Sequence, residues 1–346
     1  MTEGYQIHTQ NVTVKLDANE NPYGLHPRLW HRIMTLTWGM TPSRYPASDG
    51  AELRDQLARY LKVDGDQVIL GSGSNELIQV ALTAFREGLD QIVIPSPSFG
   101  MYRVIASMLG LTVAEIPLDL TYQIDIDAMK QAMASKRSAV FLCQPNNPTG
   151  NCFSSEAVSE ILACKPTLVI ADEAYIEFGG QSLIKQIDEY PNLLILRTLS
   201  KAFALAGLRV GYAVAQASLI DRLKRAKPPY NVSAFSLLAA GVVMDNPMLQ
   251  MNTLIPLRRD RERLRAALQE IPGLLPFPSE ANFILVRVLA EKVGLRADQI
   301  RERLLEKGMS VRYFPGNNVL NDCIRISVGR PEENARLIAA LQELEG

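Results

Sequence analysis

Short apolar runs alternate with segments of helical period from about residue 50 to residue 214, and this alternation constrains the fold more than any other feature of the sequence. Most of the runs are continuously apolar, which is typical of strands covered on both faces. The predicted strands are Val68–Leu70, Ile92–Pro95, Val113–Ile116, Val140–Leu142, Leu168–Ala171, Leu193–Arg197 and Val210–Ala213. We therefore expect an α/β fold with a mostly parallel seven-stranded sheet, covered by helices such as Asn75–Arg86 and Ser155–Ala163.

The pattern changes after Asn231 to a long helical region, followed by shorter elements. The predicted elements beyond it are the strands Phe283–Val286, Ser310–Arg312 and Ile324–Val328 and a last helix that begins at Pro331. A single core stops growing at roughly 250 to 300 residues, so a chain of 346 residues favours a second, smaller α+β domain. We expect an N-terminal arm and part of the small domain in residues 1–40, the large domain in residues 41–250, and the rest of the small domain in residues 251–346.

The composition excludes several classes of protein. The 36 basic residues nearly balance the 37 acidic ones, which gives no charge excess for nucleic acid or an anionic membrane. The 4 cysteines form no CxxC pair, and all 3 histidines lie at or before His31, which argues against a zinc site and a Ser/His/Asp triad. Neither a signal peptide nor a membrane-spanning run is predicted. We expect a cytoplasmic protein with reduced thiols and small-molecule partners.

A lysine lies between two predicted strands, in the segment Arg197–Arg209. A lysine amine forms an imine with an aldehyde only when it is neutral, so its site must disfavour the ammonium. The hydroxyls of Thr198 and Ser200 and the guanidinium of Arg209 can bind a phosphate dianion beside Lys201. A lone lysine after a strand is usually a surface residue, but this combination favours an aldehyde ligand that carries a phosphate.

An acidic residue follows the predicted strand Leu168–Ala171. Ligands of an open parallel sheet bind at the carboxyl ends of its strands, where Asp172 is expected. Its carboxylate can accept a hydrogen bond from a protonated pyridine nitrogen, which strengthens an electron sink. Tyr175 can donate to the phenolic oxygen of the same ring, and Ala174 is small enough to lie against a ring face. A helix N-cap or a structural ion pair is the alternative for Asp172, but with Lys201 it favours pyridoxal 5'-phosphate as the cofactor.

A glycine-rich turn, Gly71–Glu76, follows the strand Val68–Leu70 and opens a predicted helix. Free amides at a helix N-terminus bind anions, and glycines allow the anion to approach closely. Ser74 and Asn75 are the candidate phosphate ligands. A plain turn with a serine or asparagine cap would show the same residues. The cofactor interpretation gains weight because its phosphate needs such amides as well as Arg209.

Two further residues could contact the cofactor ring. Asn147 lies in the loop Gln144–Gly150, after the strand Val140–Leu142, and can donate to the phenolic oxygen. Alternatively, a run of Pro, Asn and Gly is only a turn that connects two elements. Phe99, predicted to begin a helix, can stack on the pyridine ring, or else serve as a core aromatic.

These motifs together resemble the fold type I pyridoxal-phosphate enzymes of the aspartate aminotransferase superfamily. Their order also matches, from the phosphate loop through the stacking aromatic, the asparagine loop, Asp-x-Ala-Tyr and Ser-Lys to the arginine. The resemblance extends from Ala18 to about Arg330. It implies a large cofactor-binding domain and a small α+β domain.

Within that superfamily the sequence is similar to the histidinol-phosphate aminotransferases. The matching segments are Ala18–Gly24, Arg44–Pro46, Thr198–Phe203 and the pair Arg312 and Arg325. The resemblance implies that Tyr45 reaches the cofactor phosphate of the other subunit of a homodimer. It implies further that Arg325 binds a substrate carboxylate, Arg312 a substrate phosphate, that Asn147 contacts the substrate, and that Tyr23 covers it.

The reaction implied by this resemblance is a transamination. L-histidinol phosphate would give imidazole-acetol phosphate, 2-oxoglutarate would become glutamate, and Lys201 would move the proton as general acid and base. Because fold does not fix reaction, three alternatives stay open. They are a phenylalanine or tyrosine aminotransferase, a decarboxylase of a phosphorylated amino acid, and a non-catalytic pyridoxal-phosphate-binding regulator.

Overall fold

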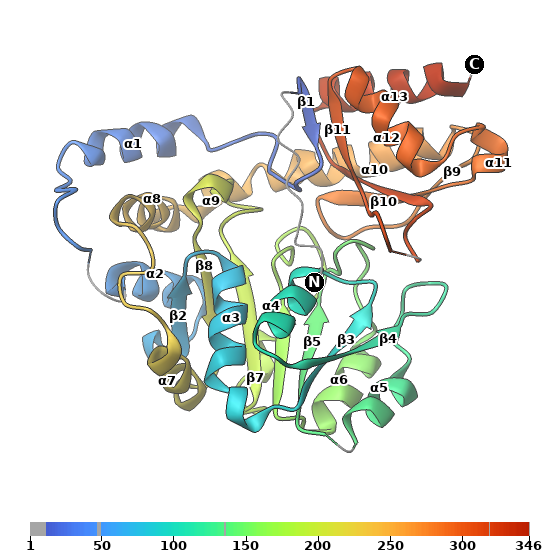
Figure 1. The fold of residues 1–346 in the computed structure, drawn as a ribbon. Helices are drawn as coiled ribbons and strands as arrows, with labels where there is room; N and C mark the ends of the chain where they lie inside the picture. Colours follow the sequence, from blue (N-terminus) through green and yellow to red (C-terminus); the bar gives the residue numbers. More distant parts are fainter. Residues whose placement is uncertain (1–11, 47–49, 135, 318, 346) are drawn as a thin grey trace.

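The large sheet of the protein has seven strands in the order β2-β8-β7-β6-β5-β3-β4 (Figure 1). The structure is a computed structural model that describes residues 12–46, 50–134, 136–317 and 319–345. The strands are β2 (Val68–Gly71), β3 (Gln91–Ser96), β4 (Thr112–Pro117), β5 (Ser138–Cys143), β6 (Leu168–Asp172), β7 (Leu193–Thr198) and β8 (Gly211–Val214). Only the pairs that involve β8 are antiparallel, so the predicted, mostly parallel seven-stranded sheet is confirmed.

Helices cover both faces of this sheet, which is why its strands are apolar throughout. One core contains Val140 and Val169 with helices α2 (Ala51–Leu61), α5 (Ile126–Met133), α6 (Ser155–Ala163) and α8 (Ala234–Asp245). The other contains Phe141 and Ile170 with helices α3 (Ser74–Ala84), α4 (Met101–Met108) and α7 (Ala217–Ala226). Successive residues of one strand therefore serve opposite cores, as the period of two requires.

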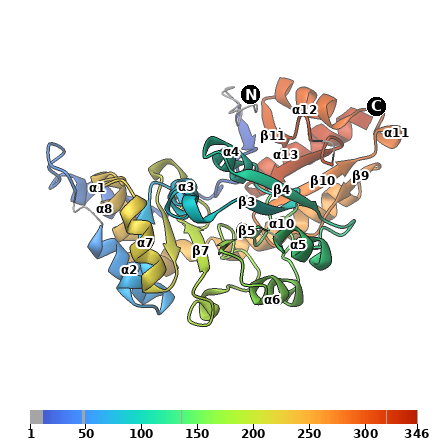
Figure 2. The same ribbon diagram turned by 60° about the horizontal axis from the view of Figure 1, so that its bottom comes forward.

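A second sheet has five strands in the order β1-β11-β12-β10-β9. They are β1 (Val14–Leu16), β9 (Leu274–Pro276), β10 (Phe283–Val288), β11 (Met309–Tyr313) and β12 (Cys323–Ser327). Its core includes residues of α10 (Leu254–Gln269), α12 (Ala297–Glu306) and α13 (Pro331–Gln342). In Figure 2 these helices α12 and α13 lie at the opposite end of the molecule from α2 and α7.

The N-terminal strand β1 pairs in parallel with β11, so the start of the described chain belongs to the second sheet. The segment then continues to α1 (Pro27–Thr37), which contacts α8 of the large domain's core. Among the described residues, the α-helices not yet named are α9 (Pro247–Met251) and α11 (Ala290–Val293). The predicted long helical region after Asn231 contains α8, α9 and α10; α8 and α9 are separate because Asn246 leaves helical geometry at φ −144° and Pro247 starts a new helix.

No helix among the described residues is long and apolar enough to cross a membrane. The same residues contain no group of three or more His, Cys, Asp or Glu side chains placed to hold a metal ion.

Candidate active site

Lys201 follows β7 at the carboxyl edge of the large sheet, and its amine faces a cavity. Nζ donates a hydrogen bond to the backbone oxygen of Ala18 at 2.9 Å and lies 5.8 Å from the centre of the Tyr175 ring. Burial among protein atoms, followed by the nearby Arg325 cation, lowers the pKa of Lys201 from 10.5 to about 7. The neutral, nucleophilic amine is therefore available near neutral pH.

Asp172 ends β6, the strand that pairs with β7, so strand pairing brings it to the same edge as Lys201. It shares the face of Ile170, which helix α4 covers, and that helix supplies Tyr102. One carboxylate oxygen accepts the Tyr102 hydroxyl at 2.6 Å, and the other accepts the backbone amide of Ala174 at 3.1 Å. Burial raises the pKa of Asp172, and the two hydrogen bonds oppose that rise. A buried carboxylate held in this way is suited to pair with a cationic ring nitrogen.

The glycine-rich turn opens α3 directly beside Arg209. Gly73 has φ +79°, and a Cβ built there would collide with the guanidinium of Arg209. A Cβ on Gly211 would collide with the backbone of Gly73 and Ser74. Both glycines are thus required for the free amides at the start of α3 to approach the arginine. Amides and a guanidinium at one place form a site for a phosphate dianion.

These groups meet in one cavity of about 380 Å³. Its lining includes Ser74, Asn75, Phe99, Asn147, Asp172, Ala174, Tyr175, Thr198, Ser200, Lys201, Arg209 and Arg325. The lining therefore joins an amine of lowered pKa, a buried carboxylate and a phosphate site. The set fits pyridoxal phosphate: the amine suits its aldehyde, the carboxylate suits its protonated ring nitrogen, and the anion site suits its phosphate.

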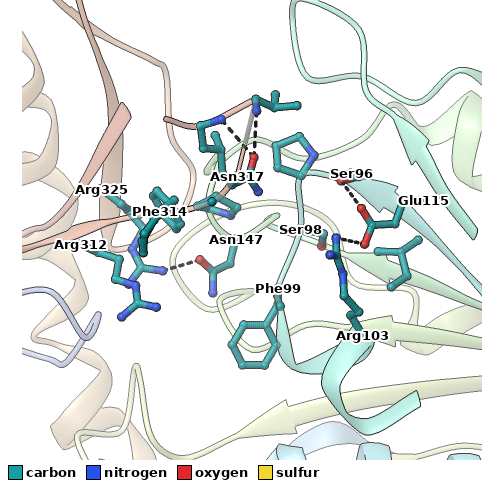
Figure 3. Close-up of a pocket in the computed structure, with 18 of the residues that line it drawn as sticks. Ser96, Ser98, Phe99, Arg103, Glu115, Asn147, Arg312, Phe314, Asn317 and Arg325 are labelled. Atoms are coloured by element: carbon teal, nitrogen blue, oxygen red, sulfur yellow. Dashed lines mark hydrogen bonds and ion pairs between the residues drawn. The ribbon is translucent and has the colours of Figure 1, made fainter. Parts of the chain in front are cut away.

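A second cavity of about 540 Å³ shares Phe99, Asn147 and Arg325 with the first. Arg312 and Arg325 are direct partners on the antiparallel strands β11 and β12, which places both guanidinium groups at this cavity. Arg325 donates to Asn147 Oδ1 at 2.5 Å and to the backbone oxygen of Asp17 at 2.7 Å. Figure 3 shows the two arginines on one side of the cavity and Arg103 with Glu115 on the other.

Two predicted site residues lie elsewhere in the single chain. Tyr45 is 81% exposed and stacks on Tyr230, with ring centres 4.6 Å apart. The Tyr23 hydroxyl donates to Asp260 at 2.6 Å. Among the described residues, neither tyrosine lines either cavity. Phe99 does line both, although it precedes α4 rather than beginning it, since the helix starts at Met101.

The structure also adds residues that were not predicted. Tyr102 bonds to Asp172, Asn19 bonds to Tyr175, and Glu115 forms an ion pair with Arg103 at the second cavity. Tyr102 lies three positions after the candidate stacking aromatic Phe99, but nothing in the sequence links it to Asp172.

The fold and this cavity define a fold type I pyridoxal-phosphate enzyme. Residues 11–341 match the family model described as aminotransferase class I and II. The histidinol-phosphate aminotransferase of Ruminiclostridium cellulolyticum is 37% identical over 342 residues, which cover 97% of this chain and 94% of that protein. The enzyme of the same name from Thermococcus gammatolerans is 37% identical, with 99% and 95% covered. The chain belongs to the class I and II aminotransferases and, within them, to the histidinol-phosphate aminotransferase family.

Solved structures agree with this assignment. Histidinol-phosphate aminotransferase from Sinorhizobium meliloti, in complex with pyridoxal-5'-phosphate, has a TM-score of 0.87 at 25% identity, with 96% of this chain and 91% of that chain covered. The enzyme of that name from Clostridium acetobutylicum has a TM-score of 0.86 at 25% identity, with 96% and 99% covered. L-threonine-O-3-phosphate decarboxylase from Porphyromonas gingivalis shares the fold with a TM-score of 0.84 at 24% identity, with 95% and 98% covered.

Proposed function

We propose that the protein transfers the amino group of L-histidinol phosphate to 2-oxoglutarate, giving imidazole-acetol phosphate and glutamate, as a step of histidine biosynthesis. The observation that supports this most strongly is the pairing of Arg312 and Arg325 at the cavity next to Lys201. Both proposed substrates, the phosphate monoester and 2-oxoglutarate, are anions that match a guanidinium fork. The relatives that carry this name support the choice of substrate.

When bound, pyridoxal phosphate supplies an electron sink for negative charge at the substrate carbon. We assign the phosphate to Ser74, Asn75, Thr198, Ser200 and Arg209, and the two ring faces to Phe99 and Ala174. Asp172 keeps a proton on the ring nitrogen, while Asn147 and Tyr175 donate to the ring oxygen.

Lys201 is assigned two roles in this proposal. Its amine holds the cofactor covalently before substrate binds, and once released it carries the proton to and from the substrate carbon. The pKa of about 7 suits both roles, because a base works best when its pKa lies near the operating pH. Arg325 then binds a substrate carboxylate, Arg312 the substrate phosphate, and Tyr23 covers the substrate, while Asn147 is held in place by Arg325.

We propose that the enzyme is a homodimer in which Tyr45 acts at the partner's cofactor phosphate. The apolar side chains Trp30, Met34 and Trp38, in and after α1, are 50%, 43% and 92% exposed on the same part of the surface of one chain. An exposed group of large apolar side chains is typical of an interface. Since Trp30 and Trp38 are the chain's only tryptophans, the protein's tryptophan emission should shift to shorter wavelength as it is concentrated through its dimerisation range. An unchanged emission and a monomer mass in light scattering would contradict the dimer.

We further propose residues 1–40, 41–250 and 251–346 as the arm, the large domain and the small domain, and the cytoplasm as the location. The two sheets and their separate cores support the division. The four cysteines, all free, agree with a reducing compartment.

Comparative turnover tests the proposed reaction. Purified enzyme with 2-oxoglutarate should convert histidinol phosphate with a much higher kcat/KM than phenylalanine or tyrosine. A preference for phenylalanine would replace this proposal by an aromatic aminotransferase. Release of carbon dioxide without consumption of 2-oxoglutarate would replace it by a decarboxylase.

A further inference from the structure

Asn19 is an almost fully buried asparagine, 1% exposed, that follows β1 and contributes to the lining of the cavity that holds Lys201. Its backbone has φ +52°, in the left-handed region. Its backbone amide donates to Ser327 Oγ at 2.8 Å, and its backbone oxygen accepts from Asn282 Nδ2 at 3.0 Å. The side chain reaches Tyr175, whose hydroxyl lies 2.9 Å from Asn19 Nδ2.

The orientation of the Asn19 side-chain amide follows from its neighbour Ser327. The serine oxygen already accepts the Asn19 backbone N–H, so its own hydrogen is left to donate. Asn19 Oδ1 lies 3.1 Å from that oxygen and is the acceptor. The other end of the amide, facing Tyr175, must then be the NH₂ group, which can only donate.

This polarity decides what the Tyr175 hydroxyl does. Its oxygen accepts from Asn19, so its hydrogen is left to donate in another direction. Tyr175 lines the cavity together with Lys201 and Asn147. Burial raises the pKa of Tyr175, while the positive charge of Arg325 and the Asn19 hydrogen bond act against that rise.

We propose that Asn19 is a positioning residue that makes Tyr175 a hydrogen-bond donor into the cavity, where it stabilises negative charge on the cofactor's ring oxygen. The inference rests on the proposed cofactor site and deepens it. A ring oxygen stabilised as an anion lowers the pKa of the imine nitrogen between Lys201 and the cofactor, because that proton is shared with the oxygen. Asn19 therefore tunes this pKa through its hydrogen bond to Tyr175.

The left-handed backbone offers a clean test, since Asn, Asp and Gly tolerate φ +52° better than other residues. Asn19→Asp preserves size and backbone but presents a carboxylate, which accepts the Tyr175 hydrogen and reverses the bond. Asn19→Gly removes the side chain and leaves Tyr175 able to donate inward. If the direction of the Asn19–Tyr175 hydrogen bond matters, Asn19→Asp should change the imine pKa strongly and Asn19→Gly only slightly. If Asn19 is merely structural, Asn19→Gly should change that pKa at least as much as Asn19→Asp.

The measurement is a spectrophotometric pH titration of the cofactor-loaded protein, which reports the imine pKa without turnover. We expect Asn19→Asp to raise this pKa by about one unit, the value of one hydrogen bond of roughly 1.4 kcal/mol. We expect a clearly smaller rise when Asn19→Asp is added to Tyr175→Phe. Equal shifts in the two backgrounds would mean that only the new charge acts, and would overturn the proposal.

Two controls complete the experiment. Asn21 is another buried asparagine of the same segment, and it bonds to the Ala202 carbonyl and Thr253 rather than to Tyr175. Asn21→Asp should shift the imine pKa much less than Asn19→Asp, and an equal shift would overturn the proposal. If Asn19→Asp does not fold, Ser327→Ala frees the amide to turn and should raise the pKa by a smaller amount; no rise would contradict the inference. A parent protein that takes up cofactor at no lysine would instead refute the cofactor site itself.

Discussion

The hydroxyl of Tyr102 donates to a carboxylate oxygen of Asp172 at 2.6 Å, and both side chains are removed from solvent. The Tyr102 ring is fixed by stacking on Phe141, with centres 4.3 Å apart, and by an edge contact to Phe99 at 5.4 Å. One tyrosine therefore touches both the proposed ring-stacking residue and the proposed partner of the ring nitrogen.

Removal of this hydroxyl should weaken the cofactor-free protein. Tyr102→Phe deprives a buried, charged carboxylate of a donor, so we expect the free energy of unfolding at neutral pH to fall by about 1.5 to 3 kcal/mol. The bond stabilises the ionised form of Asp172, whose pKa is raised by burial, so the loss should shrink as the pH falls through that raised pKa. Urea denaturation of the parent protein and of Tyr102→Phe across a pH series measures this loss of stability. A loss that does not change with pH would argue for a packing defect.

Lys201 should make the cofactor-free protein more stable as the pH rises. Its folded pKa is about 7 against 10.5 in the unfolded chain, so between these values the unfolded state binds a proton that the folded state does not. The free energy of unfolding therefore rises with pH across this window. The cofactor-free protein should gain stability relative to Lys201→Met from about pH 7 upward, and a constant difference in denaturant midpoint would contradict the lowered pKa.

A buried ion cluster of Arg197, Glu173 and Glu177 should be costly to break. Arg197 donates to Glu173 at 2.8 Å and lies 3.6 Å from Glu177, whose pKa burial raises to about 7. Arg197→Met leaves both carboxylates without their cation, which should cost about 3 to 5 kcal/mol at neutral pH. The cost should fall in acid, where the carboxylates take up protons. The control Arg137→Met, at an exposed pair with Asp90, should lower the free energy of unfolding far less in the same assay, because water screens exposed ion pairs.

The two arginines should separate the candidate substrates. Arg312→Gln removes the group assigned to the substrate phosphate, so kcat/KM for histidinol phosphate should fall by about 10- to 100-fold, the equivalent of 1.5 to 3 kcal/mol. Turnover of phenylalanine, which has no phosphate, should change little. Arg325→Gln should impair both substrates, because it also releases Asn147. Equal losses for both substrates with Arg312→Gln would remove its assignment as a phosphate ligand.

Site residues were easiest to predict from the sequence where a reactive side chain comes directly after an apolar strand. Asp172 was predicted as a site residue because a strand ends there at the carboxyl edge of the sheet, and Lys201 because two hydroxyls and an arginine accompany it after a strand. The structure brings both to one cavity. Helix α6 was predicted with its observed bounds, Ser155–Ala163, since its cap and apolar spacing are both local signals. Strands β1 and β9, three residues each, were missed because such short runs have no measurable period.

Residues that act through another residue were not predictable. Tyr102 lies 70 positions from Asp172, and Asn19 lies 156 positions from Tyr175. Neither pair has a spacing or composition that marks it, because only the packed fold brings the partners together. Tyr45 shows the opposite case, in which a family pattern named a residue whose proposed target lies on another chain.

The pairing of β1 with β11 has a consequence for biosynthesis on the ribosome. Val14 is synthesised before the whole central sheet, and its strand partner Met309 is synthesised after that sheet. The segment from Asp17 to Asn21 follows β1, and its backbone carbonyls accept hydrogen bonds from Arg325 and Lys201. A nascent chain can therefore assemble its central sheet before Arg325 has been made, yet its pocket is complete only once the segment that carries β11 and β12 has been synthesised.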